Sequence, residues 1–234
     1  MAAPKILIIT TSHTHLGNTE KKTGLWLEEL TTPYYAFVDA GASVTVASIK
    51  GGPVPIDPGS EKAAGENSPS VERFRTDTGA QTAVANTPSI NDVDANSYDA
   101  VFLPGGHGTM WDFPQSDRLG QIVAETLAQD RIVAAVCHGP AGLVSAKTAT
   151  GDSVVKGRKV ATFTDAEESA VGLTETVPFL LESKLRELGA DIHTAGNFEA
   201  YAIADGNLIT GQNPMSSELV AQKVLSAISA SVIA

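Results

Sequence analysis

Cysteine is almost absent from this sequence, which has a single one, Cys137, among 234 residues. One cysteine cannot form an internal disulfide, and this excludes the small disulfide-stabilised scaffolds of secreted proteins. Long apolar runs are also missing. None approaches the roughly 20 residues that cross a bilayer, and the run at residues 6–9 is too short for the core of a signal peptide. We therefore expect a cytoplasmic protein that does not bind membranes.

Positive charge is scarce as well. The chain has 16 Lys and Arg against 27 Asp and Glu, a formal net charge of −11. Such a surface repels a phosphate backbone, so a nucleic-acid partner is not expected. With 42% apolar and 18% charged residues, the composition is that of a globular protein. The length predicts one domain over residues 1–234.

Short apolar runs rich in β-branched residues alternate with segments of helical spacing along the chain. This alternation predicts an α/β fold in which helices cover both faces of a mostly parallel central sheet. The expected strands are residues 6–10, 43–47, 98–103, 132–136 and 159–163. The expected helices are residues 23–40, 141–146 and 178–188, with two more around residues 119–127 and 219–228.

Proline and glycine mark the places where this pattern changes. Pro33 is expected to kink or divide the first helix, because proline removes a helical hydrogen bond. Asp205 and Gly206 predict a tight hairpin turn between two apolar runs. Residues 51–91 are rich in proline and glycine and have few periodic apolar positions, which predicts a loop-rich insertion with short helical turns.

Two motifs come directly after strands of the predicted sheet. The glycine-rich residues 104–108 follow one strand, and residues 137–139 follow the next. In open parallel sheets, ligands bind beyond the carboxyl ends of the strands. The two motifs therefore predict a functional site at that edge of the sheet.

Cys137 is the strongest candidate for chemistry. A strand that turns abruptly into a helix presents its first turn residue to backbone N–H groups and to the helix dipole, and both favour the thiolate over the thiol. The alternative is a free cysteine buried as a small apolar side chain. The adjacent His138 and Gly139 favour the nucleophile.

The loop at residues 104–108 has two interpretations. Its glycines could let backbone amides approach a developing oxyanion, or they could serve only the geometry of a tight connection. The loop lacks the spacing and the lysine of a phosphate-binding loop, so ATP is not expected. No His-x-x-x-His pair or cysteine cluster predicts a metal site, and His13 and His15 are interpreted as polar loop residues. Trp26 and Trp111 are interpreted as core or as pocket wall.

Four motifs in this order resemble the ThiJ/PfpI superfamily, and within it the small heat-shock branch of glutathione-independent glyoxalases, called glyoxalase III. The resemblance implies a flavodoxin-like three-layer sandwich that uses no cofactor and forms a homodimer. A short match near the C-terminus, Gly211-Gln-Asn-Pro214, extends it. The four motifs are Thr23-Gly-Leu-Trp-Leu-Glu-Glu29, Leu103-Pro-Gly-Gly-His-Gly-Thr109, Ala135-Val-Cys-His-Gly-Pro140 and Thr162-Phe-Thr-Asp-Ala-Glu-Glu168.

The resemblance also implies a role for each candidate residue. Cys137 would be the nucleophile, His138 the general base and acid, and Glu168 the acid that orients this histidine, with Glu167 as the alternative. Glu29 would be a buried, protonated carboxyl that donates a hydrogen bond to the thiolate. The loop that binds the oxyanion and the substrate would comprise Gly105, Gly106 and His107, with the backbone amide of His138 as a second oxyanion donor.

The implied reaction converts methylglyoxal, a small reactive aldehyde, and water to lactate. The thiolate adds to the aldehyde, His138 moves a proton between two carbons, and water releases the acid. Two alternatives use the same cysteine: a stress-related holdase chaperone or redox sensor in which Cys137 oxidises, and an intracellular cysteine peptidase or amidase. Glutamine amidotransferases pair their cysteine with a distant His-x-Glu, which residues 193–195 do not supply.

Overall fold

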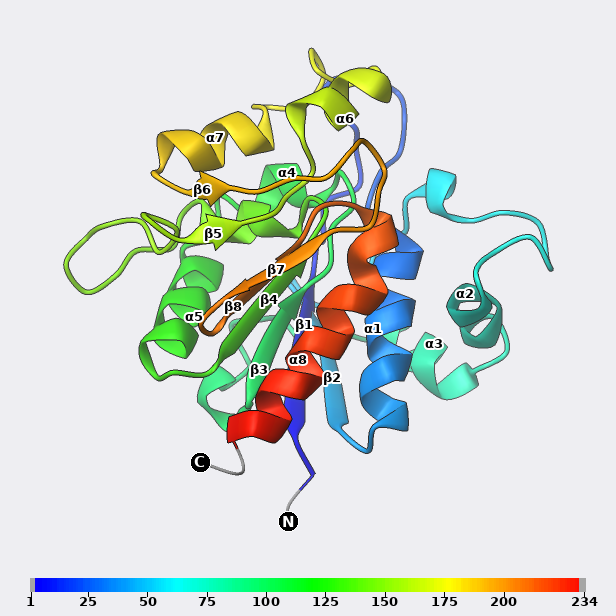
Figure 1. Ribbon diagram of the computed structural model, residues 1–234. Coiled ribbons are helices and arrows are strands. Elements are labelled where there is room, and N and C mark those ends of the chain that lie inside the picture. The colour runs from blue at the N-terminus through cyan, green and yellow to red at the C-terminus, as the bar shows by residue number, and fades with distance from the viewer. Residues whose placement is uncertain (1–2, 232–234) are drawn as a thin grey trace.

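The computed structural model describes residues 3–231, and a six-stranded sheet lies at its centre (Figure 1). The strand order is β2-β1-β3-β4-β8-β7, and all neighbouring strands are parallel except the edge strand β7, which is antiparallel to β8. The strands are β1 (Lys5–Thr10), β2 (Ser43–Ser48), β3 (Ala100–Leu103), β4 (Ile132–Val136), β7 (Ala202–Asp205) and β8 (Leu208–Gly211). The predicted α/β class with a mostly parallel sheet is confirmed.

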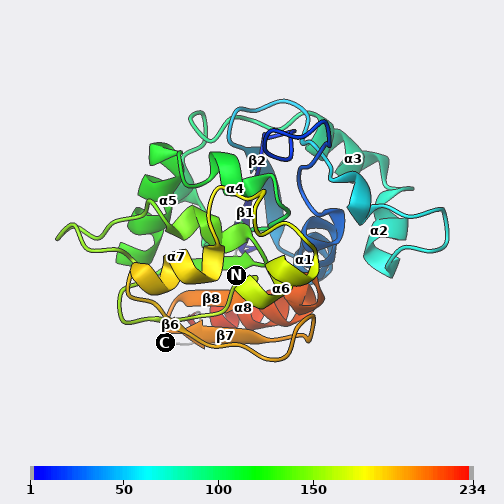
Figure 2. The ribbon, with the colours of Figure 1, turned by 90° about the horizontal axis from the view of Figure 1, so that it is seen from above.

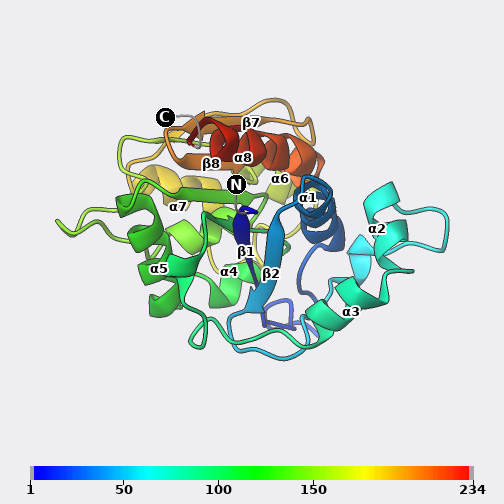
Figure 3. The same cartoon turned by 90° about the horizontal axis from the view of Figure 1, so that it is seen from below.

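Helices cover both faces of this sheet because successive strand residues point to opposite faces. Leu7 of β1 packs in one core together with residues of α5 (Asp117–Ala128). Ile8 packs in a second core with α1 (Leu27–Asp39) and α8 (Ser217–Ser231). Figure 3 shows α1 and α8 on one side of the sheet and α5 on the other. The result is the three-layer, flavodoxin-like sandwich.

The first helix is shorter than expected. It begins at Leu27 because Leu25 and Trp26 are extended and donate their backbone N–H groups to carbonyls of two other loops. Pro33 lies within α1, and the helix continues through it. The loss of one backbone donor does not interrupt a helix whose buried face packs against the sheet, so of the two effects expected at Pro33, a kink or a division, the division is wrong.

The insertion at residues 51–91 contains short helices, as predicted. They are the 3-10 helix η1 (Pro58–Ser60), α2 (Pro69–Phe74) and α3 (Thr78–Ala85). Figures 1 and 2 show α2 and α3 at one side of the sandwich, beyond α1.

Two segments between residues 137 and 163 differ from what the sequence predicts. The helix expected at residues 141–146 is a 3-10 helix, η3, and lies at Gly139–Leu143. The expected strand 159–163 is reduced to β5 (Lys159–Val160), which pairs with β6 (Asp191–Ile192) in a separate two-stranded sheet. It cannot join the central sheet beside β4, because β8 of the hairpin occupies that place.

The remaining helices are short and connect these elements. They are η2 (Ala95–Ser97), α4 (Thr109–Asp112), α6 (Asp165–Ala170), α7 (Leu181–Glu187) and η4 (Pro214–Ser216). In Figure 1, α4 and α6 lie at the upper end of the sheet, where the parallel strands β1, β3 and β4 end.

Within residues 3–231, none of the helices combines the length and the apolar character that crossing a bilayer demands.

Candidate active site

Cys137 follows directly on β4, at the carboxyl edge of the sheet. Its backbone φ is 59°, in the left-handed region that residues with a Cβ rarely adopt. Three hydrogen bonds hold it there: its N–H donates to the carbonyl of Gly211 at 3.0 Å, and its carbonyl accepts from the N–H of Phe163 at 2.9 Å and from the hydroxyl of Thr162 at 3.2 Å. Strained backbone of this kind persists only where the surroundings hold it, and it clusters at functional sites. The fold therefore fixes the direction of the Cys137 side chain.

His138 links this thiol to a carboxylate. Its Nδ1 lies 3.3 Å from Sγ of Cys137, and its Nε2 lies 2.8 Å from Oε2 of Glu168. The imidazole is buried, and its ring centroid lies 4.4 Å from that of Phe163, which covers it on one side. The three side chains form a continuous line, cysteine to histidine to glutamate.

The charges of this line follow from its surroundings. Burial alone would raise the pKa of Glu168, but the hydrogen bonds from His107 and His138 outweigh it and lower that pKa to about 2. Burial and the neighbouring His107 lower the pKa of His138 to about 4, against the opposing effect of Glu168. At neutral pH the carboxylate is charged and the imidazole is neutral. Nε2 of His138 therefore carries the proton that it donates to Glu168, and the lone pair of Nδ1 faces the thiol.

Glu167 and Glu168 have different positions although they are neighbours in α6. Glu168 reaches the histidines, whereas Glu167 points into a buried polar cluster. Oε2 of Glu167 accepts from the N–H and the hydroxyl of Thr164, the residue that caps the helix. Oε1 accepts from three other donors: the backbone N–H of Phe198 and the side-chain amides of Gln212 and Asn213. Glu167 thus ties α6 to residues 198–213 and is not a partner of His138.

Glu29 lies in the first turn of α1 and is fully buried. Its Oε2 accepts a hydrogen bond from the N–H of Gly105 at 2.7 Å. The carboxyl is also hydrogen-bonded to the thiol of Cys137. Burial raises the pKa of Glu29 to about 8, against the lowering effect of these two hydrogen bonds. Glu29 is therefore protonated at neutral pH and adds no negative charge beside the sulfur.

The expectation that the turn favours a thiolate at rest is wrong. Burial raises the pKa of the Cys137 thiol, the neighbouring Glu29 carboxyl raises it further, and the backbone N–H of His138 lowers it. The helix that was expected to stabilise the anion is a short 3-10 helix, η3, whose dipole is small. The resting pair is a thiol beside a neutral imidazole, so the nucleophile has to form by proton transfer to His138.

The glycine-rich loop after β3 lies against this pair. Because the Gly105 N–H is bonded to Glu29, it is not available to a substrate. The Gly106 N–H has no acceptor among residues 3–231, and the backbone N–H of His138 faces the Cys137 sulfur. Gly106 has a φ of 97°, and a Cβ there would lie 2.4 Å from the carbonyl oxygen of Gly24. Only glycine fits this approach of the two loops.

His107 occupies a place that its sequence neighbours did not predict. Its Nε2 lies 2.8 Å from Oε1 of Glu168, and its ring centroid lies 4.2 Å from that of His138. Its side chain is 12% exposed, against 1% for His138. The donor atoms of His107, His138 and Glu168 all lie within 4.8 Å of one another. The sequence indicated that both histidines lie near the same edge of the sheet, because each follows a parallel strand, β3 or β4. The 31-residue spacing between the two histidines does not predict that they share one carboxylate.

The two tryptophans lie at different places. Trp111 stacks on the ring of His13, with centroids 5.0 Å apart, and both line a hollow of about 480 Å³ that does not include Cys137. Trp26 is the N-cap residue of α1, and its indole lies beside Gly59. Trp111 thus forms part of the wall of a hollow that lies apart from Cys137. A role of Trp26 as pocket wall stays a prediction.

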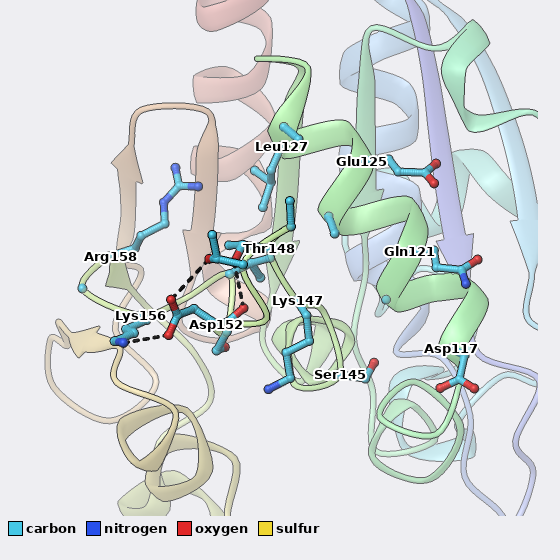
Figure 4. Close-up of a pocket in the computed structure, with 18 residues that line it drawn as sticks. Asp117, Gln121, Glu125, Leu127, Ser145, Lys147, Thr148, Asp152, Lys156 and Arg158 are labelled. Carbon is cyan, nitrogen blue, oxygen red and sulfur yellow. Dashed lines mark hydrogen bonds and ion pairs between the residues drawn. The ribbon is translucent and has the colours of Figure 1, made fainter.

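A larger groove, of about 1160 Å³, lies between α5 and residues 145–158 (Figure 4). Charges of both signs surround it, including the ion pair of Lys156 and Asp152 at 2.7 Å. None of the predicted site residues lines it, so the candidate chemistry is separate from this groove.

The fold and the site together define a class: α/β proteins that carry a cysteine, a histidine and a glutamate at the carboxyl edge of a parallel sheet. The chain belongs to the DJ-1/PfpI family, whose model matches residues 23–227. The predicted superfamily is therefore confirmed.

Several relatives match nearly end to end. Glyoxalase 3 of Candida albicans is 30% identical over 95% of this chain and 98% of its own length. The glutathione-independent glyoxalase HSP31 of Saccharomyces cerevisiae is also 30% identical, over 97% of this chain and 99% of its own. The crystal structure of the Rapid Encystment Protein 24 KDa of Francisella tularensis is 39% identical, covers 96% of this chain and 98% of its own, and superposes with a TM-score of 0.91.

Proposed function

We propose that this protein is a glutathione-independent glyoxalase that converts methylglyoxal and water to lactate. The observation that supports it most is the line of hydrogen bonds from Cys137 through His138 to Glu168, at 3.3 and 2.8 Å. In this proposal Cys137 is the nucleophile, His138 the proton carrier and Glu168 the group that orients it. The names of the fungal relatives agree with this chemistry.

The first step makes a carbon–sulfur bond. Nδ1 of His138 takes the thiol proton while the sulfur of Cys137 adds to the aldehyde carbon. The aldehyde oxygen becomes an oxyanion, and the backbone N–H groups of Gly106 and His138 are the donors that would stabilise it. His138 then returns its proton to this oxygen, which leaves a neutral hemithioacetal on the sulfur. Because Glu29 is protonated, its carboxyl places no negative charge beside the oxyanion that forms in this step.

The second step moves a hydrogen between two carbons. Nδ1 of neutral His138 removes the hydrogen of the former aldehyde carbon as a proton, and the adjacent ketone becomes the oxyanion of an enediolate. The imidazolium returns this proton to the other carbon, the hydroxyl proton of the first carbon passes to the oxyanion, and the product is the lactate thioester of Cys137. Water then cleaves the carbon–sulfur bond and restores the thiol. The sum is methylglyoxal plus water to lactic acid, so no external oxidant, reductant or cofactor is needed.

The burial of the nucleophile favours a small substrate. Cys137 is 3% exposed, so a three-carbon aldehyde can approach its sulfur with less rearrangement than a polypeptide carbonyl. This supports an aldehyde substrate over the peptidase alternative. A holdase or a redox sensor would need the same thiol but would form no lactate.

The test is a lactate assay with the purified full-length chain and methylglyoxal, without glutathione. We expect lactate from the wild-type protein and none above the uncatalysed rate from Cys137→Ala. In D2O, deuterium should enter at the carbon that bears the hydroxyl group, because an enediol exchanges its proton with solvent. Equal turnover by Cys137→Ala would refute the proposal. Lactate without deuterium would show that the hydrogen moves between the two carbons without exchange with solvent, either as a proton kept on buried His138 or as a hydride.

A further inference from the structure

Two imidazoles converge on the two oxygens of one carboxylate in the candidate site. Nε2 of His107 and Nε2 of His138 each lie 2.8 Å from a different oxygen of Glu168. The three residues come from the loop after β3, the turn after β4, and α6, and their side chains are at most 12% exposed. The proposed reaction uses one of these imidazoles. The second has no part in it.

We propose that His107, His138 and Glu168 form a binding site for a divalent transition-metal ion such as Zn²⁺ or Co²⁺. Two imidazole nitrogens and a carboxylate are a donor set that such ions accept, with room for water or another ligand at the open positions. Metal–ligand distances of about 2.0–2.2 Å place the donors around one ion roughly 3.3 Å apart. The present donor atoms all lie within 4.8 Å of one another, so each has to move by about 1 Å to reach that spacing. Mg²⁺ and Ca²⁺ fit poorly, because they prefer oxygen ligands.

The thiol is not a ligand in this site. Nε2 of His138 faces Glu168, whereas its Nδ1 faces Sγ of Cys137 at 3.3 Å. An ion bound at Nε2 is therefore on the opposite side of the ring from the sulfur. His107 has the most exposed of the three side chains, so the ion would enter past it.

Metal binding and the cysteine chemistry exclude each other. An ion at Nε2 replaces the proton that His138 donates to Glu168, and the one remaining ring proton of a neutral imidazole then sits on Nδ1. That is the nitrogen that has to accept the thiol proton. This consequence rests on the proposed function, whereas the binding site itself does not.

The binding test uses the full-length chain after treatment with EDTA and removal of the chelator. Titration with Co²⁺ should give visible ligand-field bands that saturate at one ion per chain. No thiolate-to-cobalt band should grow in the near ultraviolet, because the sulfur is not a ligand. Added Zn²⁺ should displace the cobalt. Absence of any saturable band in the wild-type protein would overturn the proposal.

Variants then locate the ion. His107→Gln and Glu168→Gln should each weaken Co²⁺ binding at least about tenfold, and Cys137→Ala should leave it unchanged. His15→Gln is the control for a surface site, because His15 is exposed and close to His13, and it too should leave binding unchanged. Loss of binding in Cys137→Ala or in His15→Gln would place the ion elsewhere and overturn the proposal. Circular dichroism of each variant checks the fold, and the wild-type titration is decisive even where a variant fails to fold.

The activity arm separates this inference from the proposed function. In a protein that forms lactate, one equivalent of Zn²⁺ should abolish turnover, and EDTA should restore it. Full turnover in the zinc-loaded protein would overturn the exclusion. A protein that binds cobalt as described but forms no lactate would refute the glyoxalase proposal and leave the metal site established.

Discussion

Oε2 of Glu168 lies 2.8 Å from Nε2 of His138, and this contact determines which ring nitrogen carries the proton and which one offers a lone pair to the thiol. The carboxylate is charged at neutral pH because its pKa is lowered to about 2, so it holds the proton of the imidazole on Nε2. Nδ1 is then left with a lone pair, 3.3 Å from Sγ of Cys137. The glutamate acts on the reaction through the histidine.

Replacement of the carboxylate should therefore impair turnover. In Glu168→Gln the charge that favours the Nε2–H tautomer and the imidazolium is gone, and we expect kcat for lactate formation to fall on the order of 10²–10⁴-fold. The exposed Glu175→Gln is the matched control and should keep wild-type activity. The measurement is lactate release at saturating methylglyoxal. A Glu168→Gln rate within threefold of wild type would contradict the orienting role.

The buried carboxyl of Glu29 should make stability depend on pH. Its pKa is raised from 4.5 to about 8 by burial, so between these values the folded state holds a proton that the unfolded chain releases. The free energy of unfolding therefore loses a contribution, on the order of a few kcal/mol, as the pH rises from about 4.5 to about 8. Urea unfolding at pH 5 and pH 8 measures it.

Glu29→Gln lacks this titration and still offers an oxygen to the N–H of Gly105. The wild-type protein should be less stable relative to Glu29→Gln at pH 8 than it is at pH 5. A stability difference between the two proteins that is the same at both pH values would show that Glu29 titrates normally.

Glu167 should be a stability residue rather than a partner of the histidine. In Glu167→Ala the amides of Gln212 and Asn213 and two backbone N–H groups lose their buried acceptor. Because unpaired buried donors are costly, we expect a loss of at least about 3 kcal/mol in the free energy of unfolding. Urea unfolding gives the value. A loss below about 1 kcal/mol would mean that water replaces the carboxylate and that the cluster does not hold the loop.

At Gly106, a side chain would cost stability in two ways: by contact with the neighbouring loop and by the strain of a left-handed backbone. Two alanine variants can separate these two costs. Gly65 has a φ of 85° with no atom within 4 Å of an added Cβ, so Gly65→Ala measures the left-handed backbone alone, about 1–2 kcal/mol. Gly106→Ala adds contacts of 2.4 Å with backbone atoms of Gly24 and Trp26, and we expect a loss of at least about 3 kcal/mol. Equal losses in the two variants, measured by thermal or urea unfolding, would show that the loops can move apart.

Local rules account for much of the fold and for part of the site. Apolar runs buried on both faces predicted the parallel strands, and the positions of residues 105–108 and 137–139 after β3 and β4 predicted the sheet edge where the site lies. The capping-box pattern of Thr164 and Glu167 is a further local signal. It assigns Glu167 to the helix end and leaves Glu168 for the histidine.

Tertiary contacts set what local rules could not supply. Glu29 reaches Gly105 across 76 residues, and His107 shares Glu168 across 61, so neither pairing has a spacing in the sequence. The raised pKa of Cys137 depends on its burial, which the strand-and-turn pattern does not specify. The segment around β5 lies outside the central sheet because β8, from the hairpin of β7 and β8, lies beside β4. Which strand pairs with β4 depends on the whole fold and not on the local sequence.

The most direct test of the account compares Cys137→Ala, His138→Gln and the double variant in the lactate assay. The effects of residues that act as one unit are not additive, so all three variants should fall to the same residual rate. Near wild-type turnover in Cys137→Ala would contradict it. A double variant whose loss is the product of the two single losses would show that the thiol and the imidazole act independently, and would contradict it too.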